Sequence, residues 1–284
     1  MKSLQKLLAN LQPAKGMIYR GQKNASWDLR PSIFRIKPGM KVDYYSHLER
    51  FKRYMIGKID DLQSMSDYEI WALGQHHGLK TPFLDWSVSP AIALYFAFEK
   101  NDGECGKSRS LFKLNAARVN EIYCEKIFDL ISAITGGSSD SKIWPKYLKG
   151  KSIIEWYEKS KKSSKDIDGR VIDMFTNMDK EYARCYSPKD LCTNRIIAQR
   201  GLFTYSLNSL CLEDILASKY ELGLYEKYEI SSSLRIKILE FLDSININDL
   251  SLFPDIEGAA KYSNTKMQIV AIDSEFPSNV RPWL

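Results

Sequence analysis

The sequence contains few residues that bind metals or form disulfides: five cysteines and three histidines among 284 residues. An odd, scattered set of cysteines argues against a disulfide framework, and no two of them have the CxxC spacing that is typical of zinc sites. His76 and His77 are adjacent, so on a helix they would point about 100° apart and rarely share one metal. We therefore expect no metal site. The cysteines are Cys105, Cys124, Cys185, Cys192 and Cys211.

Long apolar runs are also missing. The longest, Ala91 to Phe98, is too short to span a bilayer, and the segment from Met1 to Lys6 lacks the apolar stretch of a secretory signal. Hydrophobic residues make up 44% and charged residues 27% of the chain, which is ordinary for a globular protein. We expect a cytoplasmic protein with no membrane contact.

Positive charge is concentrated in one place. Residues 142–165 contain eight lysines and two glutamates, an excess that equals the formal net charge of +6. A Gly/Ser-rich stretch precedes them, so residues 135–165 are interpreted as an insertion within one domain. Aromatic residues among the lysines are compatible with nucleic-acid contact, although solvated lysines beside core aromatics fit equally. The lysines that would make this contact are Lys142, Lys146, Lys149, Lys151, Lys159, Lys161 and Lys162.

Local patterns predict alternating helices and strands without an internal repeat, which favours an α+β fold. Helices are expected near residues 4–11, 42–62, 67–75, 212–218 and 232–245. Strands are expected near residues 16–19, 82–86, 110–114 and 225–230. Residues 195–204 are predicted as a strand, a glycine turn or bulge, and a second extended piece.

The segment that begins at Ser89-Pro90 is predicted to be the central helix. Serine is a good N-cap and proline suits the first helical position. Residues 91–98 are apolar on every face, so this helix must be buried on all sides. We expect one α+β domain in which a small mixed or antiparallel sheet surrounds this helix.

Polar residues are unusually dense just before the buried helix. The segment 75–90 reads QHHGLKTPFLDWSVSP and combines two histidines, a carboxylate, a tryptophan and several hydroxyls. Such convergent polarity beside a buried element is typical of a binding or catalytic site. Two other blocks are distinctive, Tyr19-Arg20-Gly21 and the segment 195–204, RIIAQRGLFT.

In this order the blocks resemble the FRG domain family, which takes its name from an aromatic-Arg-Gly tripeptide. The resemblance also includes residues 251–258, SLFPDIEG, and covers about residues 15–262. It implies that residues 1–284 are a single FRG domain with the lysine-rich insertion. Relatives occur in bacterial and phage-associated settings, so the resemblance suggests a role in phage defence or as a toxin.

A remoter resemblance is to the ADP-ribosyltransferase fold, where such an arginine holds NAD and a serine supports the site. This resemblance implies NAD as a substrate, with His77 and Asp85 as acid and base or acting at the ribose, and Gln199 orienting a ribose hydroxyl. Ser87 or Ser89 would be the supporting hydroxyl. The residues expected to bind the nucleotide are Tyr19, Arg20, Gly21, Gln75, His76, Thr81, Trp86, Ser87, Ser89 and Arg195.

Gln199 departs from the transferase pattern because a glutamate is expected at that place on a late strand. A carboxylate stabilises the cation-like ribosyl centre, and losing its charge should cost on the order of a few kcal/mol. Either Asp85 supplies the charge, or the protein is a non-catalytic module that senses a nucleotide or binds protein or nucleic acid. Purely structural roles also stay open: Arg20 in an ion pair, Asp85 as a helix cap and Trp86 in the core. A nuclease based on the paired histidines is a third, weaker hypothesis.

Overall fold

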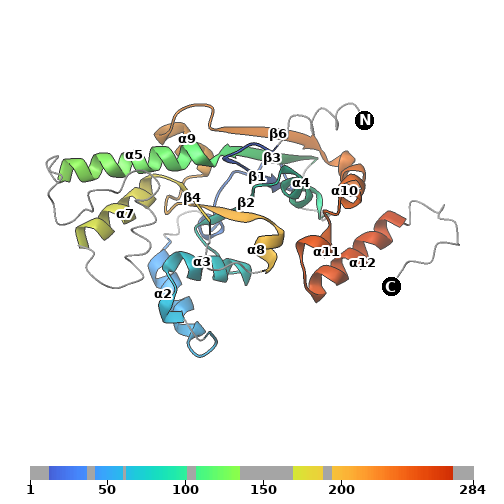
Figure 1. The fold of residues 1–284 in the computed structure, drawn as a ribbon, viewed down its shortest axis with the longest axis horizontal. Coiled ribbons are helices and arrows are strands. Elements are labelled where there is room, and N and C mark those ends of the chain that lie inside the picture. Colours follow the sequence, from blue (N-terminus) through green and yellow to red (C-terminus); the bar gives the residue numbers. More distant parts are fainter. Residues whose placement is uncertain are drawn as a thin grey trace.

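The computed structural model describes residues 13–36, 42–59, 62–100, 107–134, 169–187 and 194–270 (Figure 1). The helix predicted near residues 4–11 and the lysine-rich insertion at 135–165 lie outside these ranges, so both stay predictions. The strands are β1 (Met17–Gln22), β2 (Phe83–Ser87), β3 (Ser108–Asn115), β4 (Arg184–Tyr186), β5 (Gly201–Tyr205) and β6 (Tyr225–Ser231). The α-helices are α2 (Tyr44–Met55), α3 (Asp67–His76), α4 (Pro90–Phe98), α5 (Ala116–Ile134), α7 (Gly169–Glu181), α8 (Asn194–Ala198), α9 (Leu212–Lys219), α10 (Arg235–Ser244), α11 (Asp249–Leu252) and α12 (Ile256–Val270). Short 3-10 helices are Ser32–Phe34, Leu62–Ser64 and Ser232–Leu234.

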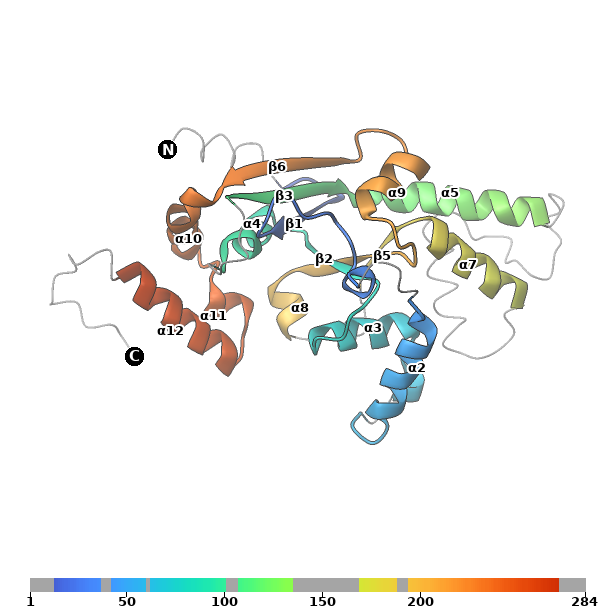
Figure 2. The ribbon, with the colours of Figure 1, turned by 180° about the vertical axis from the view of Figure 1, so that it is seen from behind.

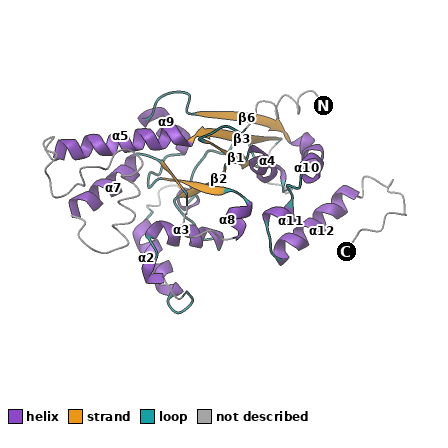
Figure 3. Ribbon diagram, viewed as in Figure 1, coloured by secondary structure: helices purple, strands orange, loops and turns teal. Residues whose placement is uncertain are grey.

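The strands form one six-stranded sheet in the order β4-β5-β2-β1-β3-β6, with helices at its ends and on both faces (Figure 3). All strand pairs within the described residues are antiparallel, so the α+β prediction is confirmed and the mixed-sheet alternative is not. β1 pairs with β3 along its whole length. Its register with β2 consists of a single pair, Tyr19 opposite Ser87.

Successive residues of β1 belong to different core clusters because side chains of a strand alternate between the faces of the sheet. Tyr19 packs with α4, α10 and α11, whereas Ile18 packs with α5 and α9. A third cluster joins α2 and α3 to Phe83, Phe203 and other residues of β2, β4 and β5. Figures 1 and 2 show α10–α12 at one end of the molecule and α5 with α7 at the other.

Helix α4 begins as its sequence predicts. The Ser89 hydroxyl accepts a hydrogen bond from the Ile92 amide at 3.4 Å, and Pro90 occupies the first turn. Leu94, Ala97 and Phe98 are fully buried. The helix lies so close to β1 that a Cβ added to Gly21 would be 2.0 Å from the Ala93 carbonyl oxygen. The glycine of the aromatic-Arg-Gly motif is therefore required by this close packing.

Two predicted elements were wrong in detail. The helix expected over residues 42–62 ends at Met55. The segment predicted as a strand from Arg195 begins instead as α8, and the strand starts only at Gly201. Arg200, with φ at 47°, turns the chain between the two elements. Gln199 thus lies in a turn and not on a late strand. None of the described helices is long and apolar enough to cross a membrane.

Candidate functional site

A cavity of about 420 Å³ lies where the sequence blocks meet. Its lining comes from β1 and the segment after it, from α3, β2, α4, α8 and β5, and from the segment that follows α11. The aromatic-Arg-Gly motif, the polar segment before α4 and the Arg195 block all contribute. Of the residues proposed from the sequence, those on the cavity wall are Tyr19, Arg20, Gly21, Gln75, His76, Asp85, Trp86, Ser87, Arg195 and Gln199.

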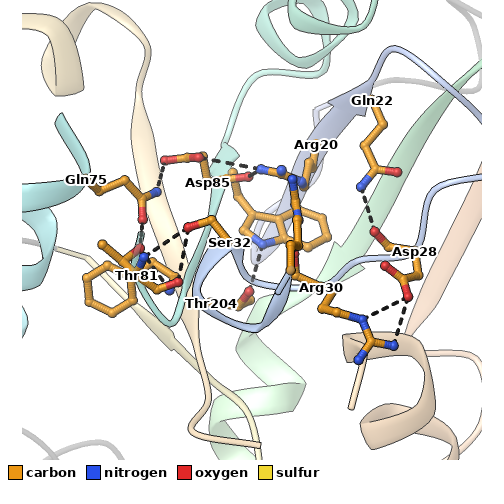
Figure 4. A network of polar contacts seen from close by, with 12 residues as sticks. Arg20, Gln22, Asp28, Arg30, Ser32, Gln75, Thr81, Asp85 and Thr204 are labelled. Atoms are coloured by element: carbon orange, nitrogen blue, oxygen red, sulfur yellow. Dashed lines mark hydrogen bonds and ion pairs between the residues drawn. The ribbon is translucent and has the colours of Figure 1, made fainter. Parts of the chain in front are cut away.

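The sheet is split at this point, and Arg20 bridges the split. β1 and β2 pair at Tyr19 and Ser87, beyond which Arg20 Nη1 donates a hydrogen bond to the main-chain oxygen of Asp85 at 2.6 Å. The same nitrogen is 3.7 Å from Asp85 Oδ2 (Figure 4). If β1 and β2 had continued to pair, a main-chain amide of β1 would have donated to the Asp85 carbonyl. The Arg20 guanidinium takes the place of that donor. Burial lowers the pKa of Arg20, while the charge of Asp85 opposes this and that of Arg35 adds to it.

Gln75 fixes Asp85 from the other side. Its amide nitrogen donates to Asp85 Oδ1 at 2.5 Å, and its oxygen accepts from the hydroxyl of Thr81 (Figure 4). Thr81 is fully buried and outside the cavity lining, so its role here is to orient Gln75. The Asp85 side chain is 65% exposed, and the cap of α4 is Ser89. The capping alternative for Asp85 is therefore wrong.

The cavity carries an excess of positive charge. Four basic side chains line it, against the carboxyl groups of Asp85 and Glu99. Burial lowers the pKa of Arg35 and raises that of Glu99. The basic residues are Arg20, Lys23, Arg35 and Arg195. A site with this balance attracts an anion.

Aromatic rings make up another part of the wall. Arg195 lies over the Phe253 ring at 4.5 Å, and Phe253 meets Phe96 edge to face with centroids 6.2 Å apart. Trp27 is 37% exposed at the same cavity. Trp86 is 3% exposed and donates its indole N–H to Thr204, so its bulk belongs to the core. The rings of Trp27, Phe96 and Phe253 are the ones suited to contact a planar ligand.

Gln199 and Ser87 hold the α8–β5 turn against the sheet. The Ser87 hydroxyl donates to the main-chain oxygen of Gln199 at 2.8 Å. The Gln199 side-chain amide donates to the Leu252 carbonyl at 3.2 Å and so links the turn to α11. Both residues have structural contacts at the cavity wall.

The two adjacent histidines differ in their position relative to the cavity. His76 lines the cavity, and burial, followed by the charges of His77 and Arg195, lowers its pKa. His77 is the exposed C-cap of α3 and, like Ser89, is outside the lining. Gly78 has φ at 85° and follows the helix end, as its position predicts. The described residues contain no group of three or more His, Cys, Asp or Glu that could hold a metal.

Sequence reasoning missed several residues of the wall, among them Lys23, Trp27, Arg35, Glu99 and Phe253. Glu99 directly follows the predicted helix, and Lys23 directly follows β1 as the structure has it; ends of elements are common places for site residues. That position alone did not distinguish them from other polar residues. Trp27, Arg35 and Phe253 stand in segments without a local pattern, so only the fold brings them together.

Comparison with known proteins finds a family match over the part of the chain that contains β1, α3, β2 and α4. Residues 15–105 match the model of the family described as FRG domain. This segment is an FRG domain. It supplies Arg20, Gln75 and Asp85, whereas Arg195 and Gln199 reach the same cavity from beyond the matched residues. No curated protein and no solved structure among those compared matches the chain.

Proposed function

We propose that the cavity binds NAD or a related nucleotide. The observation that carries this proposal is the composition of one cavity, which is lined by four basic side chains, two carboxyl groups, the exposed ring of Trp27 and the half-buried ring of Phe96. Guanidinium groups suit phosphates because their planar fork matches phosphate oxygens, and aromatic rings suit a base. A volume of about 420 Å³ is within the usual range for small-molecule sites.

Binding is tested by isothermal titration calorimetry and by thermal melting with NAD, ADP-ribose and ATP. Arg35→Gln and Arg195→Gln each remove one cation from the wall. Each should weaken binding about tenfold, because a hydrogen bond to a charged group is worth about 1.5–3 kcal/mol. Arg53→Gln, an exposed change on α2, is the matched control and should leave the affinity within about twofold. Absence of saturable binding to the wild type, or equal loss in the control, would contradict the proposal.

ADP-ribosyl transfer is the second candidate. It is supported by an arginine on β1, a serine at the end of β2 that leads into α4, and two carboxyl groups on the wall. In this reaction the bond between nicotinamide and ribose breaks, nicotinamide leaves, and a nucleophile on a macromolecule bonds to the ribose. An ADP-ribosyltransferase-like arrangement of the sheet belongs to this proposal.

A non-catalytic sensor is the alternative to transfer, and Gln199 favours it. Its amide is used by the Leu252 carbonyl, and it brings no charge to a developing cation. Incubation with labelled NAD and candidate protein and RNA acceptors separates the two. Labelled product with release of nicotinamide indicates transfer, whereas ligand-induced stabilisation without product indicates a sensor.

A further inference from the structure

Glu99 is one of the two acidic residues on the cavity wall. It directly follows α4 and is the C-cap of that helix. Its carboxyl has neither a hydrogen bond nor an ion pair with any of the residues that the structure describes, although it lines the cavity. Asp85, by contrast, is held by Arg20 and Gln75, and the Gln199 amide by the Leu252 carbonyl.

The backbone at Glu99 is held firmly by two arginines. Arg235 donates from Nε to the Phe98 carbonyl and from Nη2 to the Glu99 carbonyl, both at 2.9 Å. Arg109, which is 1% exposed, donates to the carbonyls of Ala97 at 2.5 Å and Lys100 at 2.9 Å. These four bonds satisfy carbonyl groups at the end of α4, so the main chain that carries the Glu99 side chain is held in place.

The position of the Glu99 carboxyl lowers the stability of the fold. A negative charge at a helix C-terminus opposes the helix dipole. Burial raises the pKa of Glu99, the nearby charges of Lys100, Lys261 and Lys23 oppose that rise, and Asp249 adds to it. A group that costs stability and has no partner within the described part of the chain is a candidate for contact with a ligand.

The negative charge of the Glu99 carboxylate indicates which group of a ligand it would contact. A carboxylate accepts hydrogen bonds from hydroxyl groups and repels phosphate, whereas the phosphates are served by Arg20, Arg35 and Arg195. Phe96 precedes Glu99 by three residues, so both lie on one face of the helix end. This wall therefore suits a sugar beside an aromatic ring rather than a phosphate.

We propose that Glu99 binds the hydroxyl groups of the distal ribose of a dinucleotide or of ADP-ribose, the ribose farther from the adenine. The proposal rests on nucleotide binding in the cavity and adds the part of the ligand that the site selects. ADP-ribose and ADP share the adenosine diphosphate and differ by this ribose. The wild type should therefore bind ADP-ribose about tenfold more tightly than ADP.

The test is the ratio of the two dissociation constants, measured by calorimetry for the wild type, Glu99→Leu, Glu99→Gln and Glu240→Leu. Glu240 is exposed on α10, outside the cavity lining, and serves as the matched control. Glu99→Leu should bring the ratio close to one and leave ADP binding within about twofold, whereas Glu240→Leu should retain the wild-type ratio. Glu99→Gln, which keeps an acceptor but no charge, should have an intermediate ratio.

Each outcome bears on a different claim. An unchanged ratio in Glu99→Leu, an equal loss of ADP and ADP-ribose, or no preference in the wild type would overturn the assignment of Glu99 while nucleotide binding stands. Failure of the wild type to bind either compound would instead overturn the proposed function. Melting temperatures of the ligand-free variants that are no lower than that of the wild type establish that any loss of affinity is local.

Discussion

Arg20 Nη1 lies 2.6 Å from the main-chain oxygen of Asp85, across the place where β1 and β2 part. This contact replaces a strand-to-strand hydrogen bond and keeps the guanidinium at the cavity wall. Because Gln75 holds the Asp85 carboxyl from α3, one short network fixes both charges of the pair. The structural role of Arg20 and its proposed ligand-binding role thus coincide in one side chain.

The close approach of α4 to β1 predicts a strong effect of Gly21→Ala. The added methyl group would overlap main-chain atoms of Ala93 and Ala97, at 2.0 and 2.6 Å. We expect a loss of about 3 kcal/mol in the free energy of unfolding, measured by urea denaturation. Gly201→Ala is the control, since its nearest neighbour would be 3.5 Å away and its cost should be below about 1 kcal/mol. Similar losses in both variants would contradict the packing argument.

The buried Asp179–Arg184 pair should be essential to the β4 side of the sheet. Arg184 Nε is 3.2 Å from Asp179 Oδ1, and the carboxylate also accepts from the hydroxyls of Tyr68 and Tyr123. Asp179→Asn leaves a buried cation without its counter-charge and should cost about 3–5 kcal/mol of stability. The exposed pair of Lys126 and Asp129, 3.9 Å apart, supplies the control: Asp129→Asn should change stability by less than about 0.5 kcal/mol. A small effect of Asp179→Asn in chemical denaturation would contradict this view.

Glu99→Gln should stabilise the ligand-free protein at neutral pH. Burial raises the pKa of Glu99 above its ordinary value of 4.5, so the folded chain holds this proton more tightly than the unfolded chain. The charged carboxylate therefore lowers stability above the folded pKa, and this cost disappears as the pH falls below both values. The melting temperature of Glu99→Gln should exceed that of the wild type at about pH 8, and the difference should shrink toward about pH 4. A difference that grows as the pH falls would contradict the assigned sign.

The pKa of His76 should rise when an anionic ligand binds in the cavity. Its pKa is lowered first by burial and then by the charges of His77 and Arg195, with Asp255 opposing. A bound phosphate would add negative charge near the ring and raise the pKa. NMR titration of the imidazole signals, assigned with His76→Asn, measures this pKa with and without ADP-ribose. His47, which lies outside the cavity lining, is the internal control, and an equal shift at both rings would point to a nonspecific effect.

Local patterns were enough to predict α3, β2, α4 and β6, because each has its own signal: a capping residue, a period of apolar residues, or a run of strand formers. Ser89-Pro90 and Gly78 are the clearest cases. The prediction for residues 195–198 was wrong because Ile196 and Ile197 favour a strand. The structure has a short helix there, and its Arg195 contacts Phe253 and Glu257 far along the chain. β4 has three residues and too little pattern to be recognised.

The site was only partly accessible to sequence reasoning. The motifs pointed to Arg20, Gln75 and Asp85, which the fold brings into one network. Glu99 escaped notice because what distinguishes it is that its carboxyl has no partner among the residues that the structure describes. The split between β1 and β2 is equally a property of strand pairing and not of any one segment.

The most direct test of nucleotide binding in this cavity is a crystal structure of the protein with NAD. We predict phosphate oxygens within about 3 Å of the guanidinium groups of Arg20 or Arg195, with an aromatic ring of the ligand against Phe96, Phe253 or Trp27. NAD bound elsewhere on the chain, or a cavity still empty at saturating NAD, would contradict the account.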